Sequence, residues 1–346
     1  MARYRGQGMA GTPPMTANPG HTPVLVTRTL ELLAPAGGEL AVDLTTGCGG
    51  HSLALAEAVK PDGVVIGIDA DSTCLRCAAD RVRAAGGRFE PFAGNFVEAP
   101  AFLRKTGRRA DVVLADLGFC SSQMDDPKRG FSFSAQGPLD MRYDTRGPLT
   151  AEALIARSTE RELTELIRRW GEDPLAGKIA RKLVQTRQRE PIRSTTHLAR
   201  LVLEAYGPRA RFSRIHPATR TFQALRIAVN EEIVALRSIL QHIARGAMGV
   251  HEGGWLNRGA RVAIISFHSL EDRAVKRAFA EMASRGVATL LTKGPLTADK
   301  SEIAANPRSR SAKLRAIRVD GPGGANQGWG FGVRKSGGPR LLTHEP

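Results

Sequence analysis

A glycine-dense turn at residues 47–51 (Gly-Cys-Gly-Gly-His) holds the residues best suited to chemistry, directly after an apolar stretch that ends in Asp43. Glycine tolerates positive φ and places no Cβ between the backbone and a ligand. A second apolar stretch, at 64–69, ends in Asp69. An acid at that place accepts hydrogen bonds from the ribose hydroxyls of a nucleoside cofactor. The pattern therefore predicts a nucleoside-binding site.

The details of the turn favour one nucleoside. A dinucleotide fingerprint reads G-x-G-x-x-G, with the third glycine inside the helix, whereas this turn reads G-x-G-G-H. Asp43 is unfavourable beside a pyrophosphate and favourable beside a cationic ligand. S-adenosylmethionine carries an ammonium and a sulfonium group, so we expect it to be the cofactor. The alternative is a tight turn of the kind found in any α/β protein, and the spacing to Asp69 argues against it.

A third acid, Asp116, ends the apolar stretch 110–116 and stands three residues before Phe119. Amino-group methyltransferases that act on bases carry a polar residue, two prolines and an aromatic residue in this place; the prolines are missing here. A carboxylate that accepts an N–H of a planar base amine localises the lone pair of that amine, and an aromatic ring stacks on the base. Asp116 and Phe119 are candidates for these roles, although Asp116 could equally contact the cofactor adenine.

Cys120 raises a competing hypothesis, because cytosine-C5 methyltransferases use a cysteine thiolate near this position to attack C6 of the base. Those enzymes place proline before the cysteine, whereas Phe119 precedes Cys120 here. We interpret Cys120 as a small packed residue. Cys74 and Cys77 have C-x-x-C spacing but no second pair, and four cysteines in 346 residues form no disulfide framework. We expect reduced thiols and a reaction that needs no metal.

The net charge of +16 favours a polyanionic partner through the release of counterions. We therefore expect the protein to bind nucleic acid, the alternative being a generally basic surface. No apolar run approaches the length that spans a bilayer, and the N-terminus lacks the apolar centre of a signal peptide. These features predict a cytoplasmic protein without a membrane partner.

Apolar stretches alternate with helical patterns, which predicts βαβ units and an α/β fold with a parallel, doubly wound sheet. A long helix is expected at about 219–245. Residues 1–20 and 320–346 are rich in glycine and proline, so we expect a disordered N-terminal extension and a flexible C-terminal tail. The expected strands are 39–43, 64–69, 88–92, 110–116 and 261–266, with 288–292 and 313–319 as a closing pair of edge strands.

Between 127 and 215 the pattern contains no convincing strand. This segment holds 18 Lys and Arg residues against 10 Asp and Glu residues, which is about half of the net charge. We expect an all-helical insertion that interrupts a sheet domain made of residues 21–126 and 216–319. Its helices are expected at 150–157, 160–170, 176–188 and 195–205.

Three runs, at 128–142, 216–226 and 266–273, are denser in polar residues than a plain core would be. The third follows an expected strand directly, although its Ser-Leu-Glu-Asp stretch could simply cap the next helix. We take seven polar residues of these runs as candidates for binding the substrate: Asp140, Arg142, Arg220, Gln223, Arg226, His268 and Arg273.

With these runs in view, the sequence resembles the bacterial small-subunit (16S) ribosomal RNA cytosine-N4 methyltransferase family. The matching runs follow one another in order from His21 to about Val319. They are HTPVL at 21–25, TTGCGGHS at 45–52, DLG at 116–118, RGFSF at 129–133, GPLDMR at 137–142, HPATRTFQALR at 216–226, SFHSLEDR at 266–273 and NPRSRS at 306–311.

The resemblance implies a class I (Rossmann-like) methyltransferase domain interrupted by a helical substrate-recognition domain. After the acid of the fourth strand the family reads G-V-S-S-P-Q, whereas this chain reads G-F-C-S-S-Q at 118–123. The resemblance also implies that seven residues contact S-adenosylmethionine: Gly49, Gly50, His51, Asp69, Phe96, Asp116 and Gln123.

The implied activity is methylation of the N4 amine of a cytosine in the decoding (P-site) region of 16S rRNA, in the small ribosomal subunit or its precursor. We expect an in-line displacement at the methyl carbon, catalysed mostly by positioning, with Asp116 as the candidate that holds the amine. A homodimer is compatible with this reading. Two alternatives stay open: a cytosine-C5 RNA methyltransferase that uses Cys120, and a non-catalytic RNA-binding factor of ribosome assembly.

Overall fold

The computed structural model describes residues 23–213, 215–250 and 254–323; the expected extension at 1–20 and most of the expected tail lie outside them. A seven-stranded sheet has the strand order β3-β2-β1-β4-β5-β7-β6. Strands β1 to β5 are parallel, and β7 runs antiparallel between β5 and β6. The strands are β1 (Leu40–Asp43), β2 (Val64–Asp69), β3 (Phe89–Ala93), β4 (Ala110–Asp116), β5 (Leu256–Ser266), β6 (Ala288–Leu290) and β7 (Lys313–Val319).

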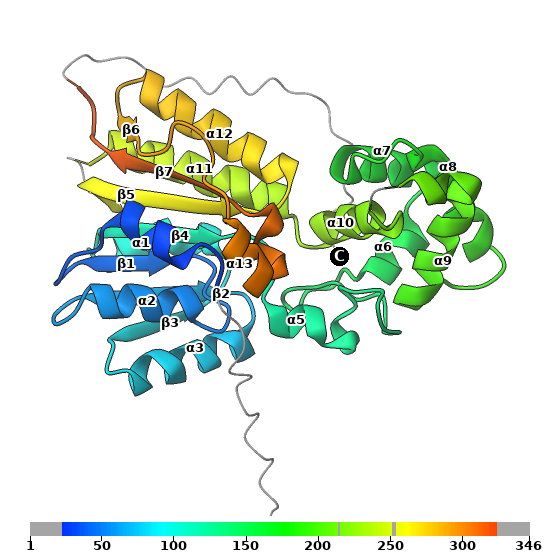
Figure 1. Ribbon diagram of the computed structural model, residues 1–346, viewed down its shortest axis with the longest axis horizontal. Helices are drawn as coiled ribbons and strands as arrows, with labels where there is room; N and C mark the ends of the chain where they lie inside the picture. The colour runs from blue at the N-terminus through cyan, green and yellow to red at the C-terminus, as the bar shows by residue number, and fades with distance from the viewer. Residues whose placement is uncertain (1–22, 214, 251–253, 324–346) are drawn as a thin grey trace, which may run out of the picture.

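The expected α/β class with a doubly wound sheet is confirmed, and the expected strands agree with the observed ones to within one residue except that β5 begins earlier and β6 ends earlier. The expectation that 313–319 forms an edge strand was wrong, because β7 pairs with β5 on one side and with β6 on the other. Side chains of the central strands alternate between two buried faces, as a strand period of two requires. Helices cover both faces (Figure 1). On one face pack α4 (Ala99–Lys105), α11 (Glu232–Met248) and α12 (Ser269–Ser284); on the other pack α1 (Val26–Leu33), α2 (Gly50–Ala58) and α3 (Ser72–Ala84).

A separate helical unit lies beyond one end of the sheet (Figure 1). It has a hydrophobic core of its own, built around residues such as Leu163, Ile167 and Leu198. Its helices are α6 (Ala151–Arg157), α7 (Glu160–Gly171), α8 (Ala176–Arg187), α9 (Thr195–Tyr206) and α10 (Ala218–Val229). Two further short helices are α5 (Ser121–Asp125), which leads into this unit, and α13 (Lys300–Ala305), which precedes β7.

The expected single helix at 219–245 was wrong, because α10 ends at Val229 and α11 begins at Glu232. Glu231 takes a left-handed conformation with φ of 51°, and the Asn230 side chain donates to the carbonyl of Met141. The break also moves the domain boundary expected at 215/216. Phe222 and Leu225 of α10 are buried in the core of the helical unit, so that unit extends to about Val229.

None of the helices in the described part of the chain is long and apolar enough to cross a membrane.

Candidate cofactor and substrate site

The turn between β1 and α2 is held in place by Asp43. The Asp43 carboxylate is fully buried and accepts hydrogen bonds from Ser52 Oγ at 2.6 Å and from the backbone N–H of Thr45 at 3.2 Å. Burial raises the pKa of Asp43 above its ordinary value, although these hydrogen bonds oppose the rise. The carboxylate that we expected to favour a cationic ligand is therefore engaged inside the protein, where it orders the turn.

The glycines of the turn are required by packing as well as by a ligand. Gly49 has φ of 78°, and a Cβ there would stand 2.7 Å from Cα of Ala78 on α3. A Cβ on Gly50 would stand 2.8 Å from Cγ of Pro23. Because both Cβ positions point at neighbouring protein atoms, side chains at Gly49 and Gly50 would first disturb the packing of the start of α2 against α3 and Pro23.

Asp69 lies at the carboxyl end of β2, beside this turn. Its Oδ2 accepts the backbone N–H of Gly47 at 2.7 Å, and its Oδ1 accepts the backbone N–H of Asp71 at 2.8 Å. Each oxygen keeps a further lone pair for another donor. Burial raises the pKa of Asp69 to about 6, against the effect of these hydrogen bonds. Such a carboxylate, fixed by the backbone, can receive two hydroxyl groups of a ribose.

Asp116 and His51 form an incompletely satisfied pair at the ends of β4 and the turn. His51 Nε2 lies 3.6 Å from Asp116 Oδ2, an ion-pair distance that is too long for a hydrogen bond. Neither His51 Nε2 nor Asp116 Oδ1 has a hydrogen-bond partner among the described residues, although both atoms are buried. Thr45 Oγ1 fixes the strand end by accepting the backbone N–H of Asp116 at 2.6 Å.

Unsatisfied buried polar atoms are rare in proteins, and they mark places where a ligand supplies the missing partner. Burial lowers the pKa of His51, but the interaction with Asp116 and the charge of Asp43 outweigh burial and raise it. The pair is thus suited to hold and polarise a group that donates hydrogen bonds.

Gln123, which we expected to contact the cofactor, is buried and has two partners in the protein. Its Nε2 donates to Asp71 Oδ2 at 3.1 Å, and its Oε1 accepts the backbone N–H of Cys120 at 3.1 Å. Arg129 Nη1 also donates to Asp71 Oδ2, at 2.8 Å. Sequence reasoning missed Asp71 and Arg129 as residues that order this edge. The available signals were an acid two residues after Asp69 and the place of Arg129 in the polar run 128–142.

Phe96 lies in a short turn of 3₁₀ helix (Phe96–Glu98) that follows β3. Its ring is partly buried against the core under α4 and α11. Gly94, two residues earlier, donates its backbone N–H to the carbonyl of Asp69, so this segment follows the end of β2. The placement suits an apolar wall beside the carboxylate of Asp69.

Cys120 faces other thiols. Its Sγ lies 3.3 Å from Sγ of Cys74 on α3, and the Sγ atoms of Cys48, Cys74 and Cys120 all lie within 4.8 Å of one another. The Cβ of Cys120 also lies 3.4 Å from the Cβ position that a side chain on Gly47 would occupy. The Cys120 thiol thus packs beneath the turn that was expected to bind the cofactor.

The seam between the sheet domain and the helical unit contains a stack of aromatic rings. Phe119 stacks on Phe131 at a centroid distance of 5.1 Å, and Phe131 stacks on Tyr143 at 5.6 Å. The guanidinium of Arg226 lies 4.9 Å from the centroid of the Phe119 ring. Phe119, which we considered for base stacking, is therefore part of a packed stack that begins three residues after Asp116.

Arg226 also forms a buried ion pair at the seam. Its Nε and Nη2 donate to the two carboxylate oxygens of Glu232 at 2.8 and 2.9 Å, and Tyr143 Oη donates to the same carboxylate at 3.0 Å. Burial lowers the pKa of Arg226, but the charge of Glu232 outweighs it and the pKa is raised. The pair joins α10 to α11 across the break at Asn230.

His268 caps α12 and pairs with Glu271 in the same cluster. His268 Nδ1 accepts the backbone N–H of Glu271, and His268 Nε2 lies 3.3 Å from Glu271 Oε1. Possible metal-ligating atoms of Glu232, His268 and Glu271 lie within 4.8 Å of one another. Because Arg226 already binds both oxygens of Glu232, a cation there would face a guanidinium at contact distance. The cluster is better described as an anchor between domains.

The other candidate substrate residues fall into two groups. Arg142 forms an ion pair with Asp140 at 2.6 Å, so this pair stabilises its own loop. The second group surrounds the end of α7: Gln223 donates to the carbonyl of Trp170, Arg220 donates to the carbonyl of Glu172, and Arg273 pairs with the Glu172 carboxylate at 3.0 Å. The structure does not bring the seven candidates into one pocket.

Comparisons with known proteins identify the family of this chain. The sequence profile of the MraW methylase family matches residues 18–320. A protein of Trichlorobacter lovleyi named ribosomal RNA small subunit methyltransferase H is 43% identical over 312 residues, covering 86% of this chain and 97% of that protein. A protein of Sorangium cellulosum with the same name is 43% identical over 307 residues, covering 88% and 93%. The chain belongs to the MraW methylase family, whose methyl donor is S-adenosylmethionine.

Proposed function

We propose that this protein transfers a methyl group from S-adenosylmethionine to the N4 amine of a cytosine in the decoding (P-site) region of 16S rRNA. The relatives named as small-subunit rRNA methyltransferases support small-subunit ribosomal RNA as the substrate. The observation that carries the proposal is Asp116 Oδ1, a buried acceptor without a partner in the described part of the chain, at the carboxyl end of β4. An exocyclic amine has two N–H groups to offer such an acceptor.

The residues of the site act by binding and orientation. Bound S-adenosylmethionine supplies a methyl carbon made electrophilic by its sulfonium. The Asp69 carboxylate, which the turn holds in place, binds the ribose, and Phe96 covers an apolar part of the cofactor. Asp116 accepts one N–H of the base amine, so the lone pair on N4 points along the line of displacement. A methylated N4 amine would have to give up a proton, and Asp116 Oδ1 is placed to take it.

The helical unit is our candidate for recognising the RNA, because its segment carries 18 basic residues against 10 acidic ones. Part of this charge is engaged within the unit: Arg181 pairs with Glu160, Lys182 pairs with Glu204, and Arg187 donates to the carbonyl of Ile155. RNA binding by this unit would therefore depend on its exposed, unpaired cations, of which Arg189 is one.

The direct test is mass spectrometry of rRNA nucleosides after small subunits are incubated with the protein and the methyl donor. We expect N4-methylcytidine in one position and no 5-methylcytidine. A product methylated at C5 would contradict the proposal, and no methylated product with intact RNA binding would favour the non-catalytic alternative.

The C5 alternative is tested at Cys120. We expect Cys120→Ala to keep wild-type methyl transfer within a few-fold, because the thiol packs against Cys74 and an N4 displacement needs no covalent nucleophile. Losing a covalent nucleophile typically abolishes turnover. The measurement is the initial rate of methyl incorporation, with Cys77→Ala as a matched control. A folded Cys120→Ala protein without activity would support the C5 mechanism.

The affinity for S-adenosylmethionine should depend on pH through Asp69. Its pKa in the free protein is about 6, and ribose hydroxyls donate to the ionised form. Binding should therefore release a proton below about pH 6, so affinity rises with pH up to that value and then levels off. Titration calorimetry at pH 5 and pH 8 measures this change. In Asp69→Asn the pH dependence should shrink and the affinity should fall. An unchanged dependence of affinity on pH would show that Asp69 does not bind the cofactor.

A further inference from the structure

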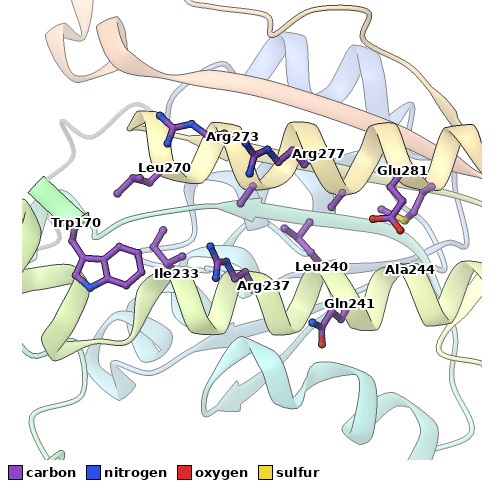
Figure 2. A pocket seen from close by; sticks show the side chains of 13 residues that line it. Trp170, Ile233, Arg237, Leu240, Gln241, Ala244, Leu270, Arg273, Arg277 and Glu281 are labelled. Carbon is purple, nitrogen blue, oxygen red and sulfur yellow. The ribbon is translucent and has the colours of Figure 1, made fainter. Parts of the chain in front are cut away.

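A groove runs between α11 and α12 on the face of the sheet domain that α4 also covers. Its volume is about 290 Å³, and its sides are apolar residues of both helices, such as Leu240 and Ala274. Figure 2 shows Leu240 on the α11 side of the groove, with Trp170 of α7 at one end. The activity described above uses none of these side chains.

The groove carries two cations without a protein partner. Arg237 of α11 and Arg277 of α12 line it and are exposed, and neither makes a hydrogen bond or ion pair with any described residue. Figure 2 shows them on opposite sides of the groove. Two arginines that converge from two rigid helices, with no acid between them, are suited to bind phosphate oxygens.

The other charges of the groove are compensated. Arg273 pairs with Glu172 at 3.0 Å, and Glu281 pairs with Arg285 at 2.7 Å. The electrostatic character of the groove is therefore set by Arg237 and Arg277, and a ligand that neutralises both must carry negative charge.

Trp170 adds an aromatic surface at the end of the groove nearest the seam. The guanidinium of Arg169 lies 4.5 Å from the centroid of the Trp170 ring, and Trp170 lines the groove. Leu270, which also lines the groove, follows His268 at the start of α12 and thus at the carboxyl end of β5. An RNA strand that ran from the seam along the groove would meet Trp170 first and then Arg237 and Arg277.

We propose that this groove binds a single-stranded RNA segment flanking the target nucleotide, with one base against Trp170 and a phosphate between Arg237 and Arg277. Bases stack on aromatic side chains without regard to sequence, while cations follow the backbone. A volume of about 290 Å³ suits one nucleotide and is small for a protein helix. The inference rests on the proposed RNA substrate but does not depend on which atom of the base is methylated.

The arginines are tested by a salt titration of RNA binding. Full-length protein carrying Arg237→Gln and Arg277→Gln is titrated with a fluorescent single-stranded fragment of 16S rRNA and with small subunits at several salt concentrations. Each lost phosphate contact should reduce the slope of log affinity against log salt by about 0.7, so the double variant, which loses the one phosphate that both arginines contact, should lose about 0.7. The matched control is Arg245→Gln with Lys276→Gln, which removes the same charge from the same two helices outside the groove.

The stacking surface is tested separately. Trp170→Ala should weaken RNA binding about tenfold, and Trp170→Phe should restore most of it because a ring remains. Affinity for S-adenosylmethionine, measured by calorimetry, should stay unchanged in all of these variants. Equal salt slopes in the groove and control variants would overturn the proposal. So would a fall in sedimentation coefficient in the groove variant alone, which would assign the groove to a second copy of the chain.

The two proposals fail in distinguishable ways. If the wild-type product is not N4-methylcytidine but the salt slope of RNA binding falls as expected in the groove variant, the groove binds RNA and the assigned reaction is wrong. If the product is N4-methylcytidine and the slope does not fall, the groove is wrong and the reaction stands.

Discussion

Replacing Asp116 with alanine is expected to lower kcat by roughly 10²–10³-fold, the range seen when one preorganised group that stabilises a transition state is removed. The physical reason is that Asp116 Oδ1 has no hydrogen-bond partner among the described residues, so the carboxylate is held in reserve for a ligand. Rates of methyl transfer at saturating cofactor, with small subunits as substrate, measure the effect. Among the described residues the side chain keeps only the 3.6 Å ion-pair contact between Oδ2 and His51, so we expect the melting temperature to change little.

Asp116→Asn separates the two roles that Asp116 could have. An amide keeps one acceptor oxygen but loses the charge beside His51, so its kcat should fall between those of the wild type and Asp116→Ala. The competing role is contact with the cofactor adenine. A large loss of S-adenosylmethionine affinity, with an unchanged rate at saturating cofactor, would assign Asp116 to the cofactor. Another residue would then have to bind the base amine.

Arg226→Ala is expected to destabilise the protein by about 3–5 kcal/mol, the cost of removing one partner from a buried ion pair. The substitution leaves the Glu232 carboxylate with Tyr143 as its remaining side-chain hydrogen-bond donor among the described residues, and it removes a charge that helps to keep the buried Glu271 ionised. It also empties the space against the Phe119 ring. Urea unfolding, followed by circular dichroism, measures the change in the free energy of unfolding.

Arg273→Ala is the matched control, because it also removes an arginine paired with a glutamate between the helical unit and the sheet domain. The side chains of Arg273 and Glu172 are 47% and 44% exposed, and such pairs contribute about 0–1 kcal/mol. Exchanging Arg226 and Glu232 together for methionine should recover part of the lost stability, since no unpaired charge then remains at Glu232. Equal small effects of Arg226→Ala and Arg273→Ala would show that the seam is open to solvent.

Local sequence determined the elements that build the sheet edge. Apolar runs that end in Asp43, Asp69 and Asp116 predicted three strands of a parallel sheet, because strand length and hydrophobic pattern are properties of a few consecutive residues. The tertiary structure then made these three strands neighbours, in the order β2-β1-β4. The glycine turn followed from backbone geometry alone, which is also local.

Only the tertiary structure decided how the side chains are partnered. Tyr143 and Glu232, which share a hydrogen bond, are far apart in the chain, and the break at Asn230 depends on a carbonyl of the distant Met141. The repeat of apolar residues continues through that break, so no local signal could reveal it. In the same way, sequence named Arg273 as a candidate but could not show that Glu172 neutralises it while Arg237 and Arg277 stay unpaired. Charge is a property of residues, whereas compensation of charge is a property of distances between them, and folding alone sets those distances.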